Sequence, residues 1–251
     1  MQPIQRVLAM LTAVAVAVAV VAVGGTGSAA ATGRHRVGGA VLAAPNHKIS
    51  HSTSTNWSGY AVTGGMYKTV TASWVQPAVT CSGTAYSSFW VGIDGDTSGT
   101  VEQTGAEADC NGSTPVYSAW YEMYPKFPTT YPDAVAPGDH FTSTVSTDGK
   151  GNFTLTLSDT TRGWTESVTK RLKSAKLASA EIIAEAPSSS GGVLPLANFG
   201  TASFSGSNVN GSTLTASTPG IDPITMQSGS TVKAQPSSIS SGAFSVTWKH
   251  S

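Results

Sequence analysis

The sequence predicts an all-β fold, a β-sandwich or a β-barrel, and two observations lead to this prediction. First, the 251 residues include only 14 basic and 14 acidic side chains, 39% are hydrophobic, and there are 27 glycines and 13 prolines. Such a composition argues against a coiled coil, a helical bundle and a polytopic membrane protein. Second, short segments rich in Val, Thr, Tyr, Trp and Phe recur from Asn56 onward, separated by Gly, Asn, Asp and Pro. Without an internal repeat or a strong linker, this region is expected to form one domain.

Residues 1–31 have the features of a secretory signal peptide. Arg6 precedes an apolar run at 7–23, and small residues follow up to Ala31. A charged start, an apolar centre and an Ala-rich cleavage region are typical of such signals. The apolar run is shorter than the ~20 residues that a membrane-spanning helix needs, which disfavours the alternative of a membrane anchor. We therefore expect a secreted, extracellular protein without stable membrane association.

Residues 32–54 are predicted to be a basic pro-segment, so the chain would be a zymogen. Residues 1–50 carry Arg6, Arg34, Arg36 and Lys48 and no acid, whereas the remainder holds 10 basic and 14 acidic residues. This opposite charge favours association of the segment with the body. A disordered linker is the alternative. Residues 55–251 would then form the functional domain.

Nine segments are expected to be strands. They are 69–75, 89–93, 116–124, 140–146, 153–157, 167–172, 180–185, 231–234 and 244–248. Turns are expected at 147–151, at 95–96 and at Asn210-Gly211, where Gly, Asn and Asp tolerate the required backbone angles.

Alternation along three of these strands gathers aromatic and acidic side chains on one face, because successive strand residues point to opposite sides. These side chains are Trp90 and Asp94, Trp120, Glu122 and Tyr124, and Glu181 and Glu185. A half-exposed sheet would show Thr, Ser and Lys there instead. The pattern favours a surface that binds a sugar or a peptide.

The two cysteines, Cys81 and Cys110, are expected to form a disulfide, as an isolated pair in an exported chain usually does. It would close a loop of about 30 residues and stabilise the fold by about 3–4 kcal/mol. The sequence holds no C-x-x-C, no H-E-x-x-H and no His/Cys cluster, so neither a metal ion nor another cofactor is expected. It also lacks a basic patch interleaved with aromatics, so nucleic acid is not an expected partner.

Five motifs occur in order along the chain. They are N-W-S-G-Y at 56–60, F-W-V-G-I-D-G at 89–95, Q-T-G at 103–105, Y-S-A-W-Y-E-M-Y-P at 117–125 and A-E-I-I-A-E at 180–185. In this order and spacing they resemble the glutamic peptidase family, also called eqolisins, over nearly all of residues 56–251. The resemblance implies a β-sandwich of two large antiparallel sheets, of the concanavalin A or lectin type, and an endopeptidase that cleaves proteins at acid pH.

The resemblance also assigns site residues. It implies that Glu185 and Gln103 are the catalytic pair. The family's substrate-binding residues match Trp57, Trp90, Asp94, Trp120, Glu122 and Tyr124. One departure affects the supporting hydrogen bonds: Ser118 stands where fungal members commonly have Asp.

The residue types fit amide hydrolysis on chemical grounds. The reaction needs a group that takes a proton from water and a donor for the developing oxyanion. A Glu185 carboxylate can do the first, and the neutral carboxamide of Gln103 can do the second at any pH. Aromatic neighbours would desolvate Glu185 and keep its pKa from falling too low. Glu181, on the same face of the strand, is expected to be a surface acid.

Other classes of protein remain open at this point. A lectin-like sandwich could be a glycoside hydrolase that uses Glu122 and Glu185 as paired acids. A pure carbohydrate-binding module is a further alternative. A serine peptidase is disfavoured, because there is no G-x-S-x-G motif and His140 is the only histidine well inside the strand-rich region. With no sequence signal for oligomerisation, we expect a monomer that acts on protein or peptide substrates.

Overall fold

The computed structural model describes residues 36–37, 40–41, 53–96 and 98–251. The chain divides into two units, Met1–Ala31 and Thr32–Ser251, and only the second contains described residues. The predicted signal peptide and most of the predicted pro-segment, including Arg34 and Lys48, therefore lie outside the described residues. Strands, turns and irregular segments make up the described part of the chain, which contains no α-helix. None of it forms a helix that is long and apolar enough to cross a membrane.

Two large sheets contain nearly all the strands. The first sheet runs in the order β18 (Ile221–Ser228), β4 (Trp57–Thr63), β13 (Ser179–Glu185), β6 (Ser88–Ile93), β7 (Val101–Asn111), β8 (Thr114–Tyr124) and β9 (Thr129–Thr130). The second runs in the order β12 (Trp164–Arg171), β11 (Asn152–Asp159), β10 (His140–Thr147), β5 (Thr69–Val75), β16 (Thr201–Val209), β20 (Phe244–Trp248) and β19 (Thr231–Pro236). β18 pairs with both β4 and β19, and so joins the two sheets along one edge.

Shorter strands complete the pairing. β3 (Thr53–Ser54) pairs in parallel with β18, and β17 (Ser212–Thr213) pairs with β16. Two separate hairpins consist of β1 (Arg36–Val37) with β2 (Ala40–Val41) and of β14 (Ser188–Ser189) with β15 (Gly192–Val193). Every pair except β3 with β18 is antiparallel.

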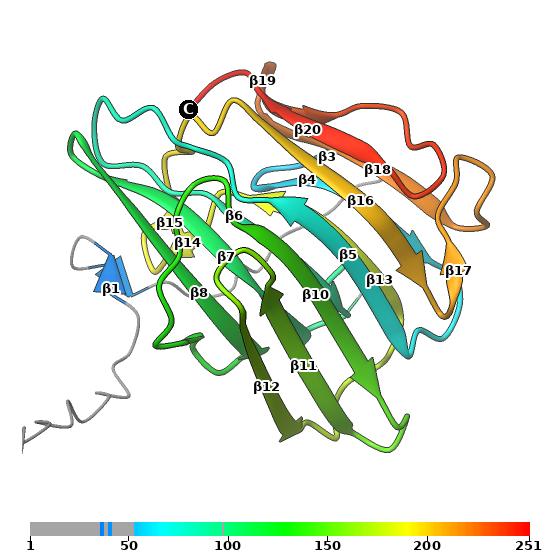
Figure 1. Ribbon diagram of the computed structural model, residues 1–251. Helices are drawn as coiled ribbons and strands as arrows, with labels where there is room; N and C mark the ends of the chain where they lie inside the picture. Colours follow the sequence, from blue (N-terminus) through cyan, green and yellow to red (C-terminus); the bar gives the residue numbers. More distant parts are fainter. Residues whose placement is uncertain (1–35, 38–39, 42–52, 97) are drawn as a thin grey trace, which may run out of the picture. The chain divides into compact units, whose positions relative to one another are not determined.

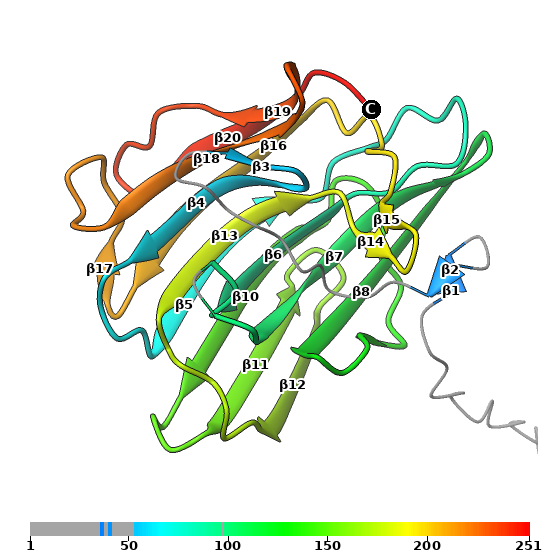
Figure 2. The same ribbon diagram turned by 180° about the vertical axis from the view of Figure 1, so that it is seen from behind.

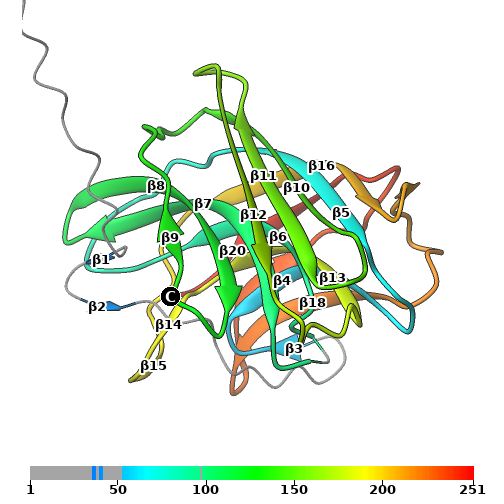
Figure 3. The same cartoon turned by 90° about the horizontal axis from the view of Figure 1, so that it is seen from below.

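The two sheets pack face to face as a sandwich. β10 lies against β6 and β7, β11 against β7, and β5 against β6 and β13. Figure 1 shows the molecule from the side of β5, β10, β11 and β16, Figure 2 from the side of β4, β13, β6, β7 and β8, and Figure 3 shows both layers from below. The main core lies between the sheets, where Phe89, Val91 and Ile93 from β6 meet Phe141 and Leu155 from the second sheet. The predicted β-sandwich of two large antiparallel sheets is confirmed.

All nine predicted segments fall on strands, with only Leu172 beyond the end of its strand, and 69–75 and 244–248 match their strands end to end. The predicted turn at Asn210-Gly211 is also present, with both residues at positive φ. Four longer strands, β4, β7, β16 and β18, lie outside the nine predicted segments. β7 is the most consequential of them, because it carries Gln103.

The predicted disulfide between Cys81 and Cys110 is present, with the two Cα atoms 5.4 Å apart. It ties the segment that precedes β6 to the end of β7. These two strands are neighbours in the first sheet, so the bond fixes one end of the β6–β7 pair.

Candidate active site

A second, smaller apolar cluster lies on the face of the first sheet that points away from the second sheet. We call this face the site face. Its buried members are Trp57, Ala61, Trp90, Val101, Trp120, Ile183 and Ile224, and Tyr124 packs against them. The predicted alternation is confirmed, since Phe89, Val91 and Ile93 belong to the main core whereas Trp90, Trp120 and Tyr124 belong to this cluster.

Glu185, the last residue of β13, lies among the aromatic side chains of the site face and is 4% exposed. The indole Nε1 of Trp90 donates to its Oε2 at 2.8 Å, and Nδ2 of Asn56 donates to its Oε1 at 3.0 Å. On β4, Trp57 pairs with Glu185 in the register. The ring of Trp57 packs edge to face against the ring of Trp90, with the ring centroids 4.9 Å apart. Both carboxylate oxygens are therefore oriented by neighbouring strands.

Two opposing effects act on the proton affinity of Glu185. Burial raises the pKa of its carboxyl to about 8, while hydrogen bonds from Trp90, Trp57 and Asn56 lower it, and the charge of Glu107 raises it further. Burial disfavours the charged form and donors favour it. Burial thus outweighs the donors, while the indoles of Trp90 and Trp57 themselves act in the lowering direction.

Gln103 lies on β7, where it faces Glu122 of β8 in the register. Its Nε2 donates to Oε2 of Glu122 at 2.6 Å, and both side chains are buried. The carboxylate thereby fixes which way the amide points. An amide nitrogen carries two hydrogens, so the second N–H of Gln103 remains available for another acceptor.

The indole of Trp90 extends from Glu185 towards Gln103. A Cβ placed on Gly92 would lie 3.0 Å from Cζ3 of Trp90 and 3.2 Å from Cβ of Gln103. The benzo edge of the indole and the base of the Gln103 side chain therefore flank the same point on β6, while the indole nitrogen bonds Glu185. Among the described residues, no hydrogen bond joins Glu185 directly to Gln103.

Gly105 explains why the Q-T-G motif ends in glycine. A Cβ at this position would lie 2.6 Å from Cβ of Trp90, a separation that packed side chains do not adopt. Gly105 lies opposite both Trp90 and Trp120 in the register. Its missing side chain lets these two tryptophans share the space above β7.

Asp94 follows β6 and has a different environment from the other predicted site residues. It is fully buried at a φ of +68°. Its carboxylate accepts backbone N–H groups from Lys176, Leu177 and Ala178 at 2.7, 2.9 and 2.8 Å. Because both oxygens are engaged, Asp94 anchors the loop that leads into β13.

The remaining predicted residues line the site face. Trp120 is 4% exposed, and its Nε1 has no hydrogen-bond partner among the described residues. Tyr124, at the end of β8, is partly exposed. In the register of β7 and β8, Trp120 lies opposite Gly105, and Glu122 lies opposite Gln103.

Three acids on this face have no assigned role in the sequence analysis. Glu181 was expected to be a surface acid, and this is wrong: it is fully buried, and burial raises its pKa well above the ordinary value. Glu107 and Asp109 of β7 are 3% and 1% exposed. Had β7 been predicted as a strand, the two-residue period would have placed both acids on the face of Gln103. The sequence of β7 is polar, however, and lacks the alternation of apolar and polar residues by which strands are recognised.

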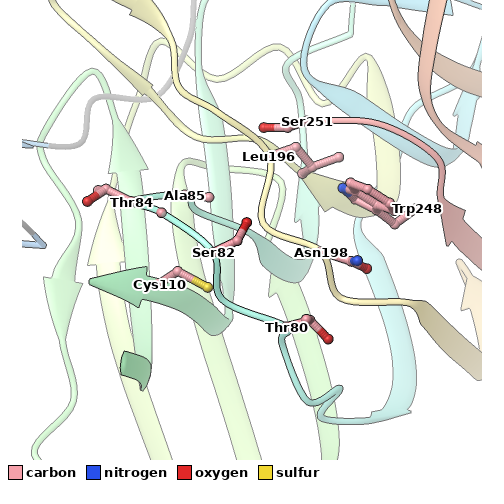
Figure 4. Close-up of a pocket in the computed structure, with 10 residues that line it drawn as sticks. Thr80, Ser82, Thr84, Ala85, Cys110, Leu196, Asn198, Trp248 and Ser251 are labelled. Atoms are coloured by element: carbon pink, nitrogen blue, oxygen red, sulfur yellow. The ribbon is translucent and has the colours of Figure 1, made fainter. Parts of the chain in front are cut away.

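The described residues include no cluster of three or more His, Cys, Asp or Glu that could hold a metal ion. A cavity of about 180 Å³ lies beside the disulfide, and Figure 4 shows its lining. Thr80, Ser82, Cys110, Leu196 and Trp248 contribute to it, and none of the predicted catalytic or substrate-binding residues does.

Comparison with known proteins identifies the family. Residues 55–248 match the model of the Peptidase A4 family, and the chain therefore belongs to this family. It is similar to aspergillopepsin-2 of Aspergillus niger, with 29% identity over 140 residues (47% of this chain and 50% of that protein). It is also similar to scytalidopepsin B of Scytalidium lignicola, with 30% identity over 128 residues (49% and 48%). The chain thus spans about half the length of the curated relatives it matches.

Solved structures agree with this placement. The chain resembles scytalido-glutamic peptidase bound to a transition-state analogue inhibitor, with a TM-score of 0.69, 25% identity and coverage of 78% of this chain and 98% of that one. It also resembles aspergilloglutamic peptidase of Aspergillus niger, with a TM-score of 0.59, 27% identity and coverage of 66% and 99%. The resemblance to glutamic peptidases seen in the five motifs is confirmed.

Proposed function

We propose that this protein is a secreted endopeptidase that hydrolyses peptide bonds at acid pH, with Glu185 and Gln103 as its catalytic pair. The observation that carries the proposal is the environment of Glu185: a buried carboxyl held by two oriented donors, on a face that also presents a carboxamide fixed by Glu122. The similarity to peptidases, one of them bound to a transition-state analogue, supports this function.

In this proposal Glu185 carries the proton through the reaction. Its carboxylate takes a proton from the attacking water and later returns it to the leaving amine. Burial favours the protonated form that delivers the proton, whereas Trp90, Trp57 and Asn56 favour the ionised form that accepts it.

Gln103 stabilises the oxyanion. Glu122 accepts one N–H of its amide at 2.6 Å, and the second N–H is directed to the carbonyl oxygen of the scissile bond. A neutral amide does not lose this donor as the pH changes. Glu122 is therefore a positioning residue for Gln103.

The aromatic residues of the site face would hold an extended peptide. Tyr124 is partly exposed and packs against the buried Trp57, Trp90 and Trp120, so these rigid aromatic rings would form the floor of the binding surface at low entropic cost. Protein or peptide chains are thus the expected substrates. One solved structure similar in fold is described as a complex with the tripeptide Ala-Ile-His.

If the protein were a glycoside hydrolase, Glu122 and Glu185 would have to act as a free pair of acids. Glu122 instead accepts the amide of Gln103, and its register row differs from that of Glu185. His140 is exposed on β10 of the second sheet, away from the site face, which also argues against a serine peptidase.

The basic pro-segment belongs to the same proposal. Residues 32–54 carry Arg34, Arg36 and Lys48, whereas the body is acidic. At neutral pH the ionised acids of the body would attract this segment and keep the zymogen inactive. Acidification would neutralise those acids and release it for cleavage. The signal peptide at 1–31 would direct the chain out of the cell.

The test is a zymogram with denatured protein as substrate at about pH 4, where carboxyl-dependent proteolysis is expected. The wild-type chain should clear the substrate. Glu185→Gln and Gln103→Ala should both be folded by circular dichroism and lose roughly 10²–10⁴-fold in kcat/KM. Near-normal proteolysis by folded Glu185→Gln would disprove the assignment and leave Glu122 as the next candidate base.

A further inference from the structure

The register of the first sheet places Glu107 in line with Glu185. Glu185 on β13 pairs with Ser88 on β6, and Ser88 pairs with Glu107 on β7. All three side chains share the site face, and Ser88 is short. Two strand spacings, each about 4.8 Å, separate the two acids, and no large side chain of the row stands between them.

Glu107 is held by two further groups. The hydroxyl of Ser118, its register partner on β8, donates to Oε2 at 3.3 Å. Its carboxyl also hydrogen-bonds the carboxyl of Asp109, the next residue on the same face of β7. A hydrogen bond between two carboxyl groups requires that one of them carries a proton.

Asp109 is the group that carries this proton. It is 1% exposed and accepts the backbone N–H of Ser87 at 3.0 Å. Burial is the largest effect that raises the pKa of Asp109 well above its ordinary value, and the charge of Glu107 is the second largest. Asp109 is therefore the neutral member of the pair and donates its proton to Glu107, whose charge acts on Asp109 and on Glu185 alike.

We propose that Glu107 is a positioning residue that sets the pH at which Glu185 ionises, and that Asp109 keeps Glu107 charged by donating its proton to it. The charge on Glu107 faces Glu185 across Ser88 and opposes the loss of the Glu185 proton. This inference rests on the proposed function, because it concerns the ionisation of the proposed catalytic acid.

The surroundings of the pair contain few other titratable groups. Among the described residues that face Glu185, β4 presents Trp57 and β6 presents Ser88 and Trp90, none of which titrates. Glu181 lies on the same strand face as Glu185, four register positions away. Tyr86, just before β6, faces Glu107 and Asp109. Burial is the largest cause that raises the pKa of Tyr86, and the charges of Asp109 and Glu107 raise it further. Glu107 is thus the acid that shares the register row of Glu185.

The experiment measures kcat/KM against pH with the full-length chain after acid activation. Glu107→Gln keeps size and shape but removes the charge. The midpoint that reports Glu185 should move to lower pH by about one unit, as expected for two charges about 10 Å apart in a partly buried site. Glu166→Gln on β12 removes a carboxyl from the second sheet and is the matched control, with an unchanged midpoint.

Variants of Asp109 separate proton donation from mere packing. Asp109→Asn keeps a neutral donor, so Glu107 stays charged and the midpoint stays within about 0.3 unit of wild type. Asp109→Ala removes the donor that stabilises the Glu107 carboxylate, so the influence of that charge on Glu185 weakens and the midpoint moves in the same direction as in Glu107→Gln. A structural role alone would lower activity in these variants without moving the midpoint, and would not distinguish Asn from Ala.

The outcomes distinguish this inference from the proposed function. If Glu185→Gln is inactive but neither Glu107→Gln nor Asp109→Ala moves the midpoint, the inference is wrong and the catalytic assignment stands. A shift to higher pH in Glu107→Gln also overturns it. If folded Glu185→Gln remains active, the proposed function fails and this inference fails with it. Should Glu107→Gln not fold, the Asn and Ala variants of Asp109 decide alone.

Discussion

The properties of Glu185 come from neighbours that act in opposite directions. Burial and the charge of Glu107 raise the pKa of its carboxyl, whereas donors on Trp90, Trp57 and Asn56 lower it. Each neighbour comes from a different strand or strand end, so no single segment of sequence sets the proton affinity. Single substitutions should therefore move the pH profile in directions that can be stated in advance.

Trp90→Phe tests the strongest of these donors. The ring remains, but the indole N–H that reaches Oε2 of Glu185 at 2.8 Å is lost. The ionised form loses a hydrogen bond to a charged group, so we expect the pKa of Glu185 to rise and kcat/KM at acid pH to fall by roughly 10–100-fold. The pH–rate profile measures this. Trp164→Phe on β12, whose N–H bonds a backbone carbonyl, is the control and should leave the profile in place.

Glu122→Ala tests the orientation of Gln103. Without the carboxylate that accepts its Nε2, the amide can rotate and present its oxygen to the oxyanion. We expect kcat to fall by at least about 10-fold while KM changes little, because the proposed function assigns substrate binding to the aromatic residues. Steady-state kinetics on a peptide substrate decide this. A change confined to KM would instead place Glu122 in substrate binding.

At the scale of single elements, β7 carries most of what distinguishes this site. One of its faces adds Ala106, Ala108 and Cys110 to the main core, and the other carries Gln103, Glu107 and Asp109. Both faces are buried, so the usual contrast between apolar and polar sides is absent from its sequence. The strand is therefore defined by its partners β6 and β8 rather than by its own composition.

Gly105→Ala should disrupt this strand. A Cβ at this position would lie 2.6 Å from Cβ of Trp90, and Trp90 is held between its neighbours and Glu185. Overpacking of this kind costs about 1–3 kcal/mol or more, so the melting temperature and the activity should both fall. Gly83→Ala is the control, because a Cβ there meets nothing within 4 Å. Equal melting temperatures for the two variants would contradict the steric argument.

At the scale of the whole molecule, several buried acids make stability depend on pH. Burial raises the pKa of Glu102 to about 9 and that of Glu185 to about 8, and it raises those of Glu181 and Asp109 as well. The native state thus binds more protons than the unfolded chain, in which Glu ionises near pH ~4.3. The stability from these groups is fully present below that pH and is lost as the pH rises towards about 9.

We therefore expect the melting temperature to be highest below about pH 5 and to fall steadily towards alkaline pH, as scanning calorimetry would show. Glu102→Gln, which mimics the protonated side chain in the core, should flatten this dependence. Asp148→Asn at an exposed turn should leave its slope above pH 5 unchanged. A melting temperature that rises between pH 5 and pH 9 would contradict the role of the buried acids.

The sequence by itself determined the parts of this protein that depend on local pattern. Alternation in 89–93, 120–124 and 180–185 was enough to assign each side chain to the main core or the site face, since the period of a strand is fixed by its backbone. The cysteine pair predicted the disulfide, and five ordered motifs predicted the family.

Only the tertiary structure decided how the acids of the site face are grouped. Glu185 shares its register row with Glu107, through Ser88, rather than with Gln103. Gln103 pairs with Glu122, and Glu181 is buried instead of exposed. These facts depend on which residues of β13, β6, β7 and β8 pair, and shifting one strand by two residues would regroup the acids without changing the face of any side chain. Burial and proton affinity follow from that pairing, because the residues that desolvate each carboxyl come from strands far apart in the chain.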